Sequence, residues 1–267
     1  MKLTYLVPTF DQVCDTTLWM FDDNSVIPDW LDCIFSAYPI LDKGKVFSMP
    51  WEKRRRYLKE KFKKIYQETI PLFKEKADQW NTYFNSHATT LAETFGKIFN
   101  VDATKVLNDI TGYPNLNPIC PRYIDEHSFY IDYSMPNEYV FLSSVHEIIH
   151  FFWFYKWQEY FHDNPKEYNT PHLKWIYSEM LIDTFTRHSD LKKFFPDKYQ
   201  SAYDCFYHLQ INGQDALPIF ADIYKNAGLK GLFTTGFDIM KKNEEEIRSA
   251  LNKITNSSCW DPPALAQ

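Results

Sequence analysis

The sequence of 267 residues predicts an α+β protein that is predominantly helical. Apolar residues recur at helical spacing in much of the chain, notably in 50–100, 136–158 and 190–253. One short segment, 127–133, alternates in the manner of a strand instead. The hydrophobic content of 45% is enough for a sizeable core. These observations favour a helical protein with a small sheet.

The chain is expected to divide into a helical N-terminal region, 1–100, and a second domain, 101–267, although the two could form one continuous domain. A helix is expected to open at Pro28 and to run through Ala37. Residues after 50 continue as long helices in which Pro71 should cause a break or a kink, because proline removes a helical hydrogen bond.

A basic series marks the start of this second helical stretch. Its members are Lys53, Arg54, Arg55, Arg56, Lys59, Lys61, Lys63 and Lys64. We interpret it as a solvated helix face offset by neighbouring glutamates, because the net charge of the whole chain is −6. That balance argues against a nucleic-acid or anionic-membrane partner, whereas docking to an acidic partner stays open as an alternative.

The composition also bears on the compartment. The five cysteines are scattered, odd in number and without a C-x-x-C pair, which favours reduced thiols in the cytosol over a disulfide framework. The N-terminus is a poor signal peptide, and no apolar run is long enough to span a membrane. We therefore expect a cytoplasmic protein. The seven glycines include no phosphate-binding loop.

The pattern changes between the two helical stretches. Residues 105–111 are expected to form a short strand, and 113–121, rich in Pro and Asn, to form a loop. The alternating segment 127–133 is expected to be a strand. Ser134, followed by a proline and a glutamate, is typical of a helix start, so the next helix should span about 136–158.

The C-terminal part is expected to be helical again. One helix should open at Pro196 and end near Ile211, where Asn212-Gly213 would terminate it. Two more are expected over 215–227 and 237–253.

The sequence His146-Glu147-Ile148-Ile149-His150 stands out within the helix expected at 136–158. Residues four apart lie one turn apart on the same face of a helix, so His146 and His150 can direct two imidazoles to one point. That arrangement suits a zinc ion. Glu147 would lie beside that point, where a carboxylate can take a proton from a metal-bound water.

A catalytic zinc ion takes three protein ligands. The candidate for the third is Glu179, on a helix that should start at Thr170-Pro171, with the threonine as its N-cap. Asp183 follows one turn later on the same face. We expect Glu179 to bind the metal and Asp183 to accept the free ring N–H of one histidine.

The pattern His146-Glu147-x-x-His150, followed by Glu179-x-x-x-Asp183, resembles the gluzincin group of zinc metallopeptidases. The spacer between the two motifs is longer than in thermolysin-like enzymes, and Ser178 stands where an Asn often precedes the ligand Glu. The resemblance implies a zincin-like domain with a small antiparallel or mixed sheet, a Zn²⁺ cofactor and a peptide or protein substrate.

The resemblance also implies roles for residues outside the motifs. The strand 127–133 would lie at the edge of the sheet and pair with extended substrate through Phe129, Ile131 and Tyr133. A tyrosine or histidine after the ligand glutamate would stabilise the oxyanion, for which Tyr203, Tyr207 and His208 are the candidates. No G-x-M-E-N aminopeptidase marker is present, which favours an endopeptidase or oligopeptidase.

Several alternatives remain open. The histidines could be core residues satisfied by backbone carbonyls, in a helical interaction protein without metal. A zincin scaffold could also keep its metal for partner binding without catalysis. Glu159-x-x-His162 repeats the spacing of Glu147-x-x-His150, as in di-iron bundles, but twelve residues on one helix rotate the second pair by about 120°.

Overall fold

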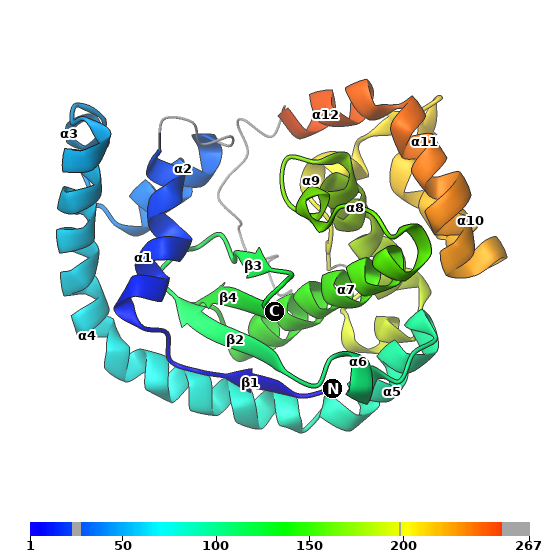
Figure 1. Ribbon diagram of the computed structural model, residues 1–267, viewed down its shortest axis with the longest axis horizontal. Helices are drawn as coiled ribbons and strands as arrows, with labels where there is room; N and C mark the ends of the chain where they lie inside the picture. The colour runs from blue at the N-terminus through cyan, green and yellow to red at the C-terminus, as the bar shows by residue number, and fades with distance from the viewer. Residues whose placement is uncertain (23–27, 198, 253–267) are drawn as a thin grey trace. The chain divides into compact units, whose positions relative to one another are not determined.

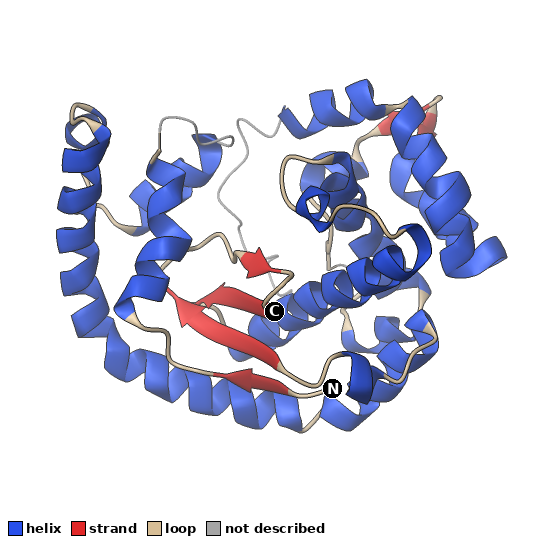
Figure 2. Ribbon diagram, in the orientation of Figure 1, coloured by secondary structure: helices blue, strands red, loops and turns tan. Residues whose placement is uncertain are grey.

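The computed structural model describes residues 1–22, 28–197 and 199–252 (Figure 1). These residues form many helices, a four-stranded mixed sheet and a two-stranded hairpin (Figure 2). The expectation of a predominantly helical α+β protein is confirmed. Among the described helices, none combines the length and the apolar character that crossing a membrane would require.

The elements follow one another in this order: β1 (Leu3–Tyr5), α1 (Phe10–Leu18), η1 (Trp19–Phe21), α2 (Pro28–Ala37), α3 (Lys43–Phe47), α4 (Trp51–Asn85), α5 (Ala88–Phe99), α6 (Ala103–Val106), β2 (Ile110–Asn115), β3 (Arg122–Tyr123), β4 (Ser128–Asp132), α7 (Asn137–Phe161), η2 (Pro165–Tyr168), α8 (Leu173–His188), η3 (Asp190–Phe194), α9 (Asp204–Tyr207), β5 (Gln210–Ile211), β6 (Gln214–Asp215), α10 (Ala216–Gly231), η4 (Leu232–Gly236), α11 (Phe237–Lys242) and α12 (Glu244–Asn252).

The described chain forms two compact units that are not successive in sequence. Among the described residues, the first contains Met1–Ala88 and Asn108–Ser143, and the second contains Thr89–Leu107 and residues from 144 to 252. The division therefore differs from the single cut expected near residue 100. The reason is the sheet, because its strand β1 comes from the N-terminus and pairs with β2, more than 100 residues later.

The sheet of the first unit has the order β1-β2-β4-β3. The first three strands are parallel, and β3 is antiparallel to β4. Helix α4 packs along β1 and β2 (Figure 1). Tyr5 lies between Trp80 of α4 and Phe129 of β4, with ring centroids 5.3 and 6.3 Å away. A Cβ at Gly112 would lie 2.5 Å from the Tyr5 ring, which explains the glycine at this crossing.

The strand expected at 127–133 is present as β4, but it is not at the edge of the sheet. β3 covers its start, because Arg122 pairs with Phe129. Phe129 and Ile131 are completely buried, and Tyr133 packs its ring against Phe73. The expectation that this strand pairs with substrate at an open edge of the sheet is therefore wrong at Phe129, where β3 already occupies the edge. It has no support at Ile131 and Tyr133.

The strand expected at 105–111 is displaced. Helix α6 occupies its first residues, and β2 runs from Ile110 to Asn115, into the expected loop. Pro114 is tolerated there because its nitrogen faces the side of β2 on which β1 has already ended. The last bond on that side joins the Leu6 N–H to the Gly112 carbonyl.

Helix α4 is continuous through Pro71, so a break is absent, but Figure 1 shows that the helix bends sharply along its length, in line with the kink that was the other expected outcome. Pro71 is exposed, while Leu58, Phe62 and Phe73 of the same helix are buried. Water can satisfy the carbonyl that proline leaves without a donor on the exposed side, so that the buried side holds the helix together.

Arg54 does not belong to a solvated helix face, because only 3% of it is exposed. Its guanidinium donates to the carbonyls of Phe21 (2.7 Å), Val46 (3.2 Å) and Met49 (3.1 Å). It also lies 4.7 Å from the ring centre of Phe47. Arg54 therefore binds α3 and η1 to α4, and the interpretation of the basic series is wrong for this residue.

Replacing Arg54 by methionine should lower the free energy of unfolding by about 2–4 kcal/mol, because several buried carbonyls lose a charged donor. Urea unfolding measures the loss. Arg55→Met, at the exposed neighbouring position, should change stability by less than about 0.5 kcal/mol. Equal effects of the two substitutions would contradict a structural role for Arg54.

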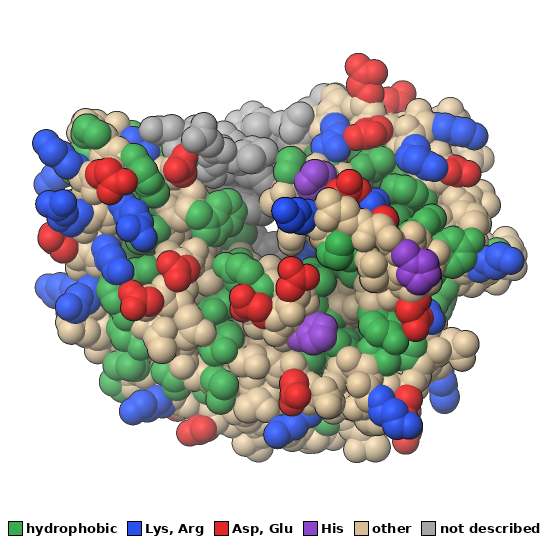
Figure 3. All heavy atoms as spheres, viewed as in Figure 1, with side chains coloured by type: hydrophobic (Ala, Val, Ile, Leu, Met, Phe, Trp, Pro, Cys, Tyr) green, Lys and Arg blue, Asp and Glu red, His purple; other side chains and the backbone are tan. Residues whose placement is uncertain are grey.

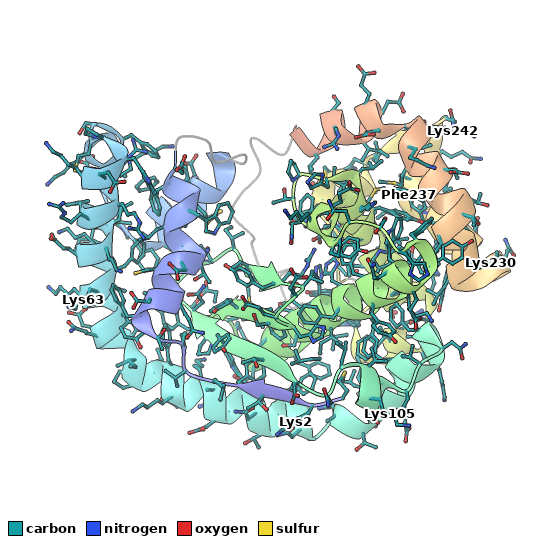
Figure 4. All side chains as sticks on the ribbon, viewed as in Figure 1. Lys2, Lys63, Lys105, Lys230, Phe237 and Lys242 are labelled. Carbon is teal, nitrogen blue, oxygen red and sulfur yellow. The ribbon has the colours of Figure 1, made fainter. Side chains whose placement is uncertain are left out.

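The second unit is organised by aromatic contacts to α7. Phe152 stacks on Phe95 of α5 at 4.9 Å, and Trp153 packs edge-on against Tyr177 of α8 at 5.6 Å. Trp157 meets Phe237 of α11 at 4.7 Å (Phe237 is labelled in Figure 4). These contacts fix the rotation of α7 about its axis, and with it the direction of its polar side chains.

The C-terminal part contains fewer residues in long helices than expected. Among the described residues of the segment 196–211, regular structure is limited to the short α9 and strand β5. Asn212 and Gly213 have φ values of 52° and 77° and form the turn between β5 and β6, so they make a hairpin instead of ending a helix. The last expected helix is divided into α11 and α12 at Asn243.

Candidate metal centre

Helix α7 positions the two histidines. His146 and His150 are one turn apart, and their Nε2 atoms lie 3.1 Å from each other. His150 is completely buried, and the side chain of His146 is 21% exposed. The residues between and around them, including Val145, Ile148 and Ile149, are buried and apolar. Two imidazoles thus meet inside an otherwise apolar helix environment.

Helix α8 contributes the carboxylate that sequence spacing indicated. Oε2 of Glu179 lies 3.4 Å from Nε2 of His146 and 3.4 Å from Nε2 of His150. Only 4% of Glu179 is exposed. The helix begins at Leu173 with His172 as its N-cap, so the start expected at Thr170 is wrong by a few residues. Glu179 still reaches the histidines, because the buried residues of α8 determine how the helix is rotated about its axis, wherever its first turn begins.

The three donor atoms fit a zinc ion. Ligands 2.0–2.2 Å from a tetrahedral ion are separated from one another by about 3.3–3.6 Å. The observed separations are 3.1, 3.4 and 3.4 Å. Two imidazole nitrogens and one carboxylate oxygen are also the ligand set of a catalytic zinc site that keeps its fourth position for water.

A second carboxylate, Glu147, lies at the same place and is 6% exposed. Its Oε1 is 4.0 Å from Nε2 of His146, and it forms a possible metal-binding group with the two histidines, in which all ligand atoms lie within 4.8 Å of one another. Glu179 is closer and is equidistant from both imidazoles. The distances therefore favour Glu179 as the third ligand and leave Glu147 beside the site.

The negative charges of Glu147 and Glu179 also favour a cation at this place. Two buried carboxylates next to each other are costly unless a cation balances them. A divalent ion between Glu147, Glu179 and the two imidazoles would supply that balance.

The sequence led us to expect that Asp183 accepts a hydrogen bond from a histidine ring. Within the described residues it has other partners instead. Its Oδ1 accepts hydrogen bonds from Nε of Arg187 (2.6 Å) and from Oη of Tyr207 (2.5 Å). Arg187 follows Asp183 by one helical turn and competes for the carboxylate with a full charge. Asp183 is thus held on the side of α8 that faces the segment after η3.

This interaction fastens the segment 199–207 to α8. Arg187 donates to the Tyr199 carbonyl (2.8 Å), and Tyr207 Oη accepts from the Ser201 backbone N–H (3.0 Å). Burial and then the charge of Asp183 raise the pKa of the Tyr207 phenol. Burial lowers the pKa of Arg187, but its contacts with Asp183 and Tyr207 outweigh this, so the pKa lies above its ordinary value.

The three oxyanion candidates differ in their surroundings. The hydroxyl of Tyr207 is engaged by Asp183, and the side chain of His208 is 77% exposed, 3.8 Å from Asp204. Tyr203 is half-buried, and its ring centre lies 6.2 Å from that of Trp175, one turn before Glu179 on α8. Tyr203 therefore stays the candidate for the expected role.

The di-iron alternative loses support. Glu159 is exposed and pairs with Lys156 at 2.5 Å, and His162 is exposed beyond the end of α7 with φ 52°. Arg187 was missed by the sequence reasoning, although its spacing of four from Asp183 could have signalled the ion pair.

No family model, curated protein or solved structure matches the chain. The interpretation of the site therefore rests on the residues and their geometry.

Glu179→Ala should weaken zinc binding by more than about a hundredfold, since even outer residues of a zinc site change affinity by 10–100-fold. Competition titration with a zinc chelator measures the affinity. Glu159→Ala removes an exposed carboxylate from α7 and should leave the affinity unchanged. Unaltered zinc binding in Glu179→Ala would exclude Glu179 as a ligand.

Tyr207→Phe should lower the free energy of unfolding by about 1.5–3 kcal/mol, because a buried carboxylate loses a hydrogen bond. The matched control is Tyr160→Phe, since Tyr160 is 44% exposed. Urea unfolding compares the two. A loss no larger than that of the control would show that the Asp183 contact does not stabilise the fold.

Proposed function

We propose that the protein is a zinc-dependent metallopeptidase of the gluzincin type, with His146, His150 and Glu179 as metal ligands. The observation that carries the proposal is the triangle of donor atoms, in which two sides of 3.4 Å fall within the ligand spacing around a tetrahedral zinc ion and the third, at 3.1 Å, is slightly shorter. The alternative of two core histidines satisfied by the backbone does not account for a buried glutamate equidistant from both.

A zinc ion in this triangle would supply a bound water of lowered pKa and polarise the substrate carbonyl. Glu147 lies near the donors, where its carboxylate would accept a proton from the attacking water and return it to the leaving amine. Its burial, with 6% exposed, restricts competing water around that carboxylate.

Tyr203 is assigned to the developing negative charge on the carbonyl oxygen, because a preorganised O–H donor stabilises an oxyanion. Asp183, Arg187 and Tyr207 hold the segment that carries Tyr203 against α8. These three are positioning residues in this account.

The substrate class is a peptide or a protein. An endopeptidase or oligopeptidase is favoured over an aminopeptidase, since the chain has no G-x-M-E-N sequence to bind a free amino terminus. A cytoplasmic location is part of the proposal and is supported by the free thiols of Cys14 and Cys205.

Glu147→Gln should lower the rate of peptide hydrolysis by a factor of about 10²–10⁴ while zinc remains bound, because the amide cannot accept the proton. Cleavage of a pool of internally quenched peptides measures activity, and elemental analysis of protein purified without a histidine tag measures zinc. Glu159→Gln is the matched control on the same helix and should retain full activity.

The same experiment separates the two principal hypotheses. Loss of activity with zinc retained supports the peptidase. Stoichiometric zinc in the unaltered protein, with no cleavage of any peptide in the pool, would instead support a metal centre that serves partner binding without catalysis.

A further inference from the structure

The segment 43–64, which contains α3 and the first turns of α4, differs in charge from the rest of the chain. It contains ten Lys and Arg residues and two Glu, a net charge of +8. The other residues contain nineteen Lys and Arg and thirty-three Asp and Glu, a net charge of −14. The overall charge of −6 therefore hides a strong segregation.

Four cations of this segment project from one side of α4 into solvent, and we call them the basic face: Lys53, Arg56, Lys63 and Lys64. Glu60, which is also exposed, lies on the same side and offsets one of these charges. Figure 3 shows Lys and Arg side chains gathered at the left edge, over α3 and α4, and Figure 4 labels Lys63 there. Within the described chain, none of these four cations forms an ion pair, whereas Lys43 pairs with Asp32 and Lys59 with Asp11.

The position of these charges on the helix is unfavourable for stability. Lys53, Arg55 and Arg56 lie in the first two turns of α4, where the helix dipole disfavours cations. Arg54, in the same run, is used inside the fold for backbone carbonyls, but the three exposed cations have no such role. A local arrangement that opposes stability is expected where it serves binding.

We propose that the basic face of α4 binds an acidic polypeptide segment. From Lys53 to Lys64 the helix rises by about 17 Å, the length of about five residues of extended chain. A run of about five Asp or Glu residues thus covers the basic face from end to end.

The charge of the remaining chain favours this short partner over a larger polyanion. A lipid surface or a nucleic-acid duplex extends well beyond a patch of this length, and the net charge of −14 on the other residues opposes the approach of such a large polyanion. At physiological salt, charges interact over about 8 Å, so a short acidic segment on α4 is attracted without that repulsion. This proposal does not depend on the zinc site.

Fluorescence anisotropy with a labelled hexaglutamate peptide tests the proposal on the full chain. Binding is expected at 50 mM salt and should weaken strongly at 300 mM salt. A fourfold variant of the basic face should bind at least tenfold more weakly: Lys53→Gln, Arg56→Gln, Lys63→Gln and Lys64→Gln.

The matched control removes four exposed lysines elsewhere, three of which Figure 4 labels: Lys2→Gln, Lys225→Gln, Lys230→Gln and Lys242→Gln. It should bind the peptide within twofold of the unaltered protein, with thermal unfolding showing that both variants fold. The proposal is overturned by no binding at 50 mM salt, by equal weakening in the control, or by tighter binding to phosphatidylserine vesicles or a 20-base-pair RNA duplex.

Discussion

The second unit depends on how it accommodates two carboxylates in an apolar interior. Glu147 and Glu179 are almost fully buried and lie beside the imidazoles of His146 and His150. An ionised carboxylate in such a place is costly unless it is paired or coordinates a metal. A divalent cation bound by both helices would remove that cost, and its binding would then stabilise the packing of α7 against α8.

The apolar surroundings determine the geometry of the donors. Phe152, Trp153 and Trp157 pack against rings from α5, α8 and α11, and these contacts set the rotation of α7. On α8, two carboxylates that lie one turn apart, Glu179 and Asp183, have different partners. Glu179 meets the histidines, while Asp183 holds the segment that carries Tyr203. One helix thus connects the candidate metal centre to its supporting hydrogen bonds.

Local spacing made the centre of the site predictable. His146 and His150 share a face because a helix repeats every 3.6 residues, and Glu179 could be chosen because a catalytic zinc ion needs a third ligand. The spacing of four could have revealed the pairing of Asp183 with Arg187, but not its contact with Tyr207, since that depends on where residues 199–207 return to α8. The Asn212-Gly213 turn carried a hairpin signal that the helical pattern around it obscured.

The sheet was also predicted only in part from the sequence. The alternation in 127–133 indicated a strand, but its neighbours were set by two short segments with little pattern of their own, Leu3–Tyr5 and Arg122–Tyr123. The edge position was therefore wrong although the strand was right. Long-range pairing decides such questions, and a single sequence carries little information about it.

The most direct test of this account is a crystal structure of the zinc-loaded protein with an anomalous difference map at the zinc edge. The account predicts one strong peak about 2.0–2.2 Å from Nε2 of His146, Nε2 of His150 and a carboxylate oxygen of Glu179. A peak elsewhere, or no peak with Glu179 turned away from the histidines, would contradict it.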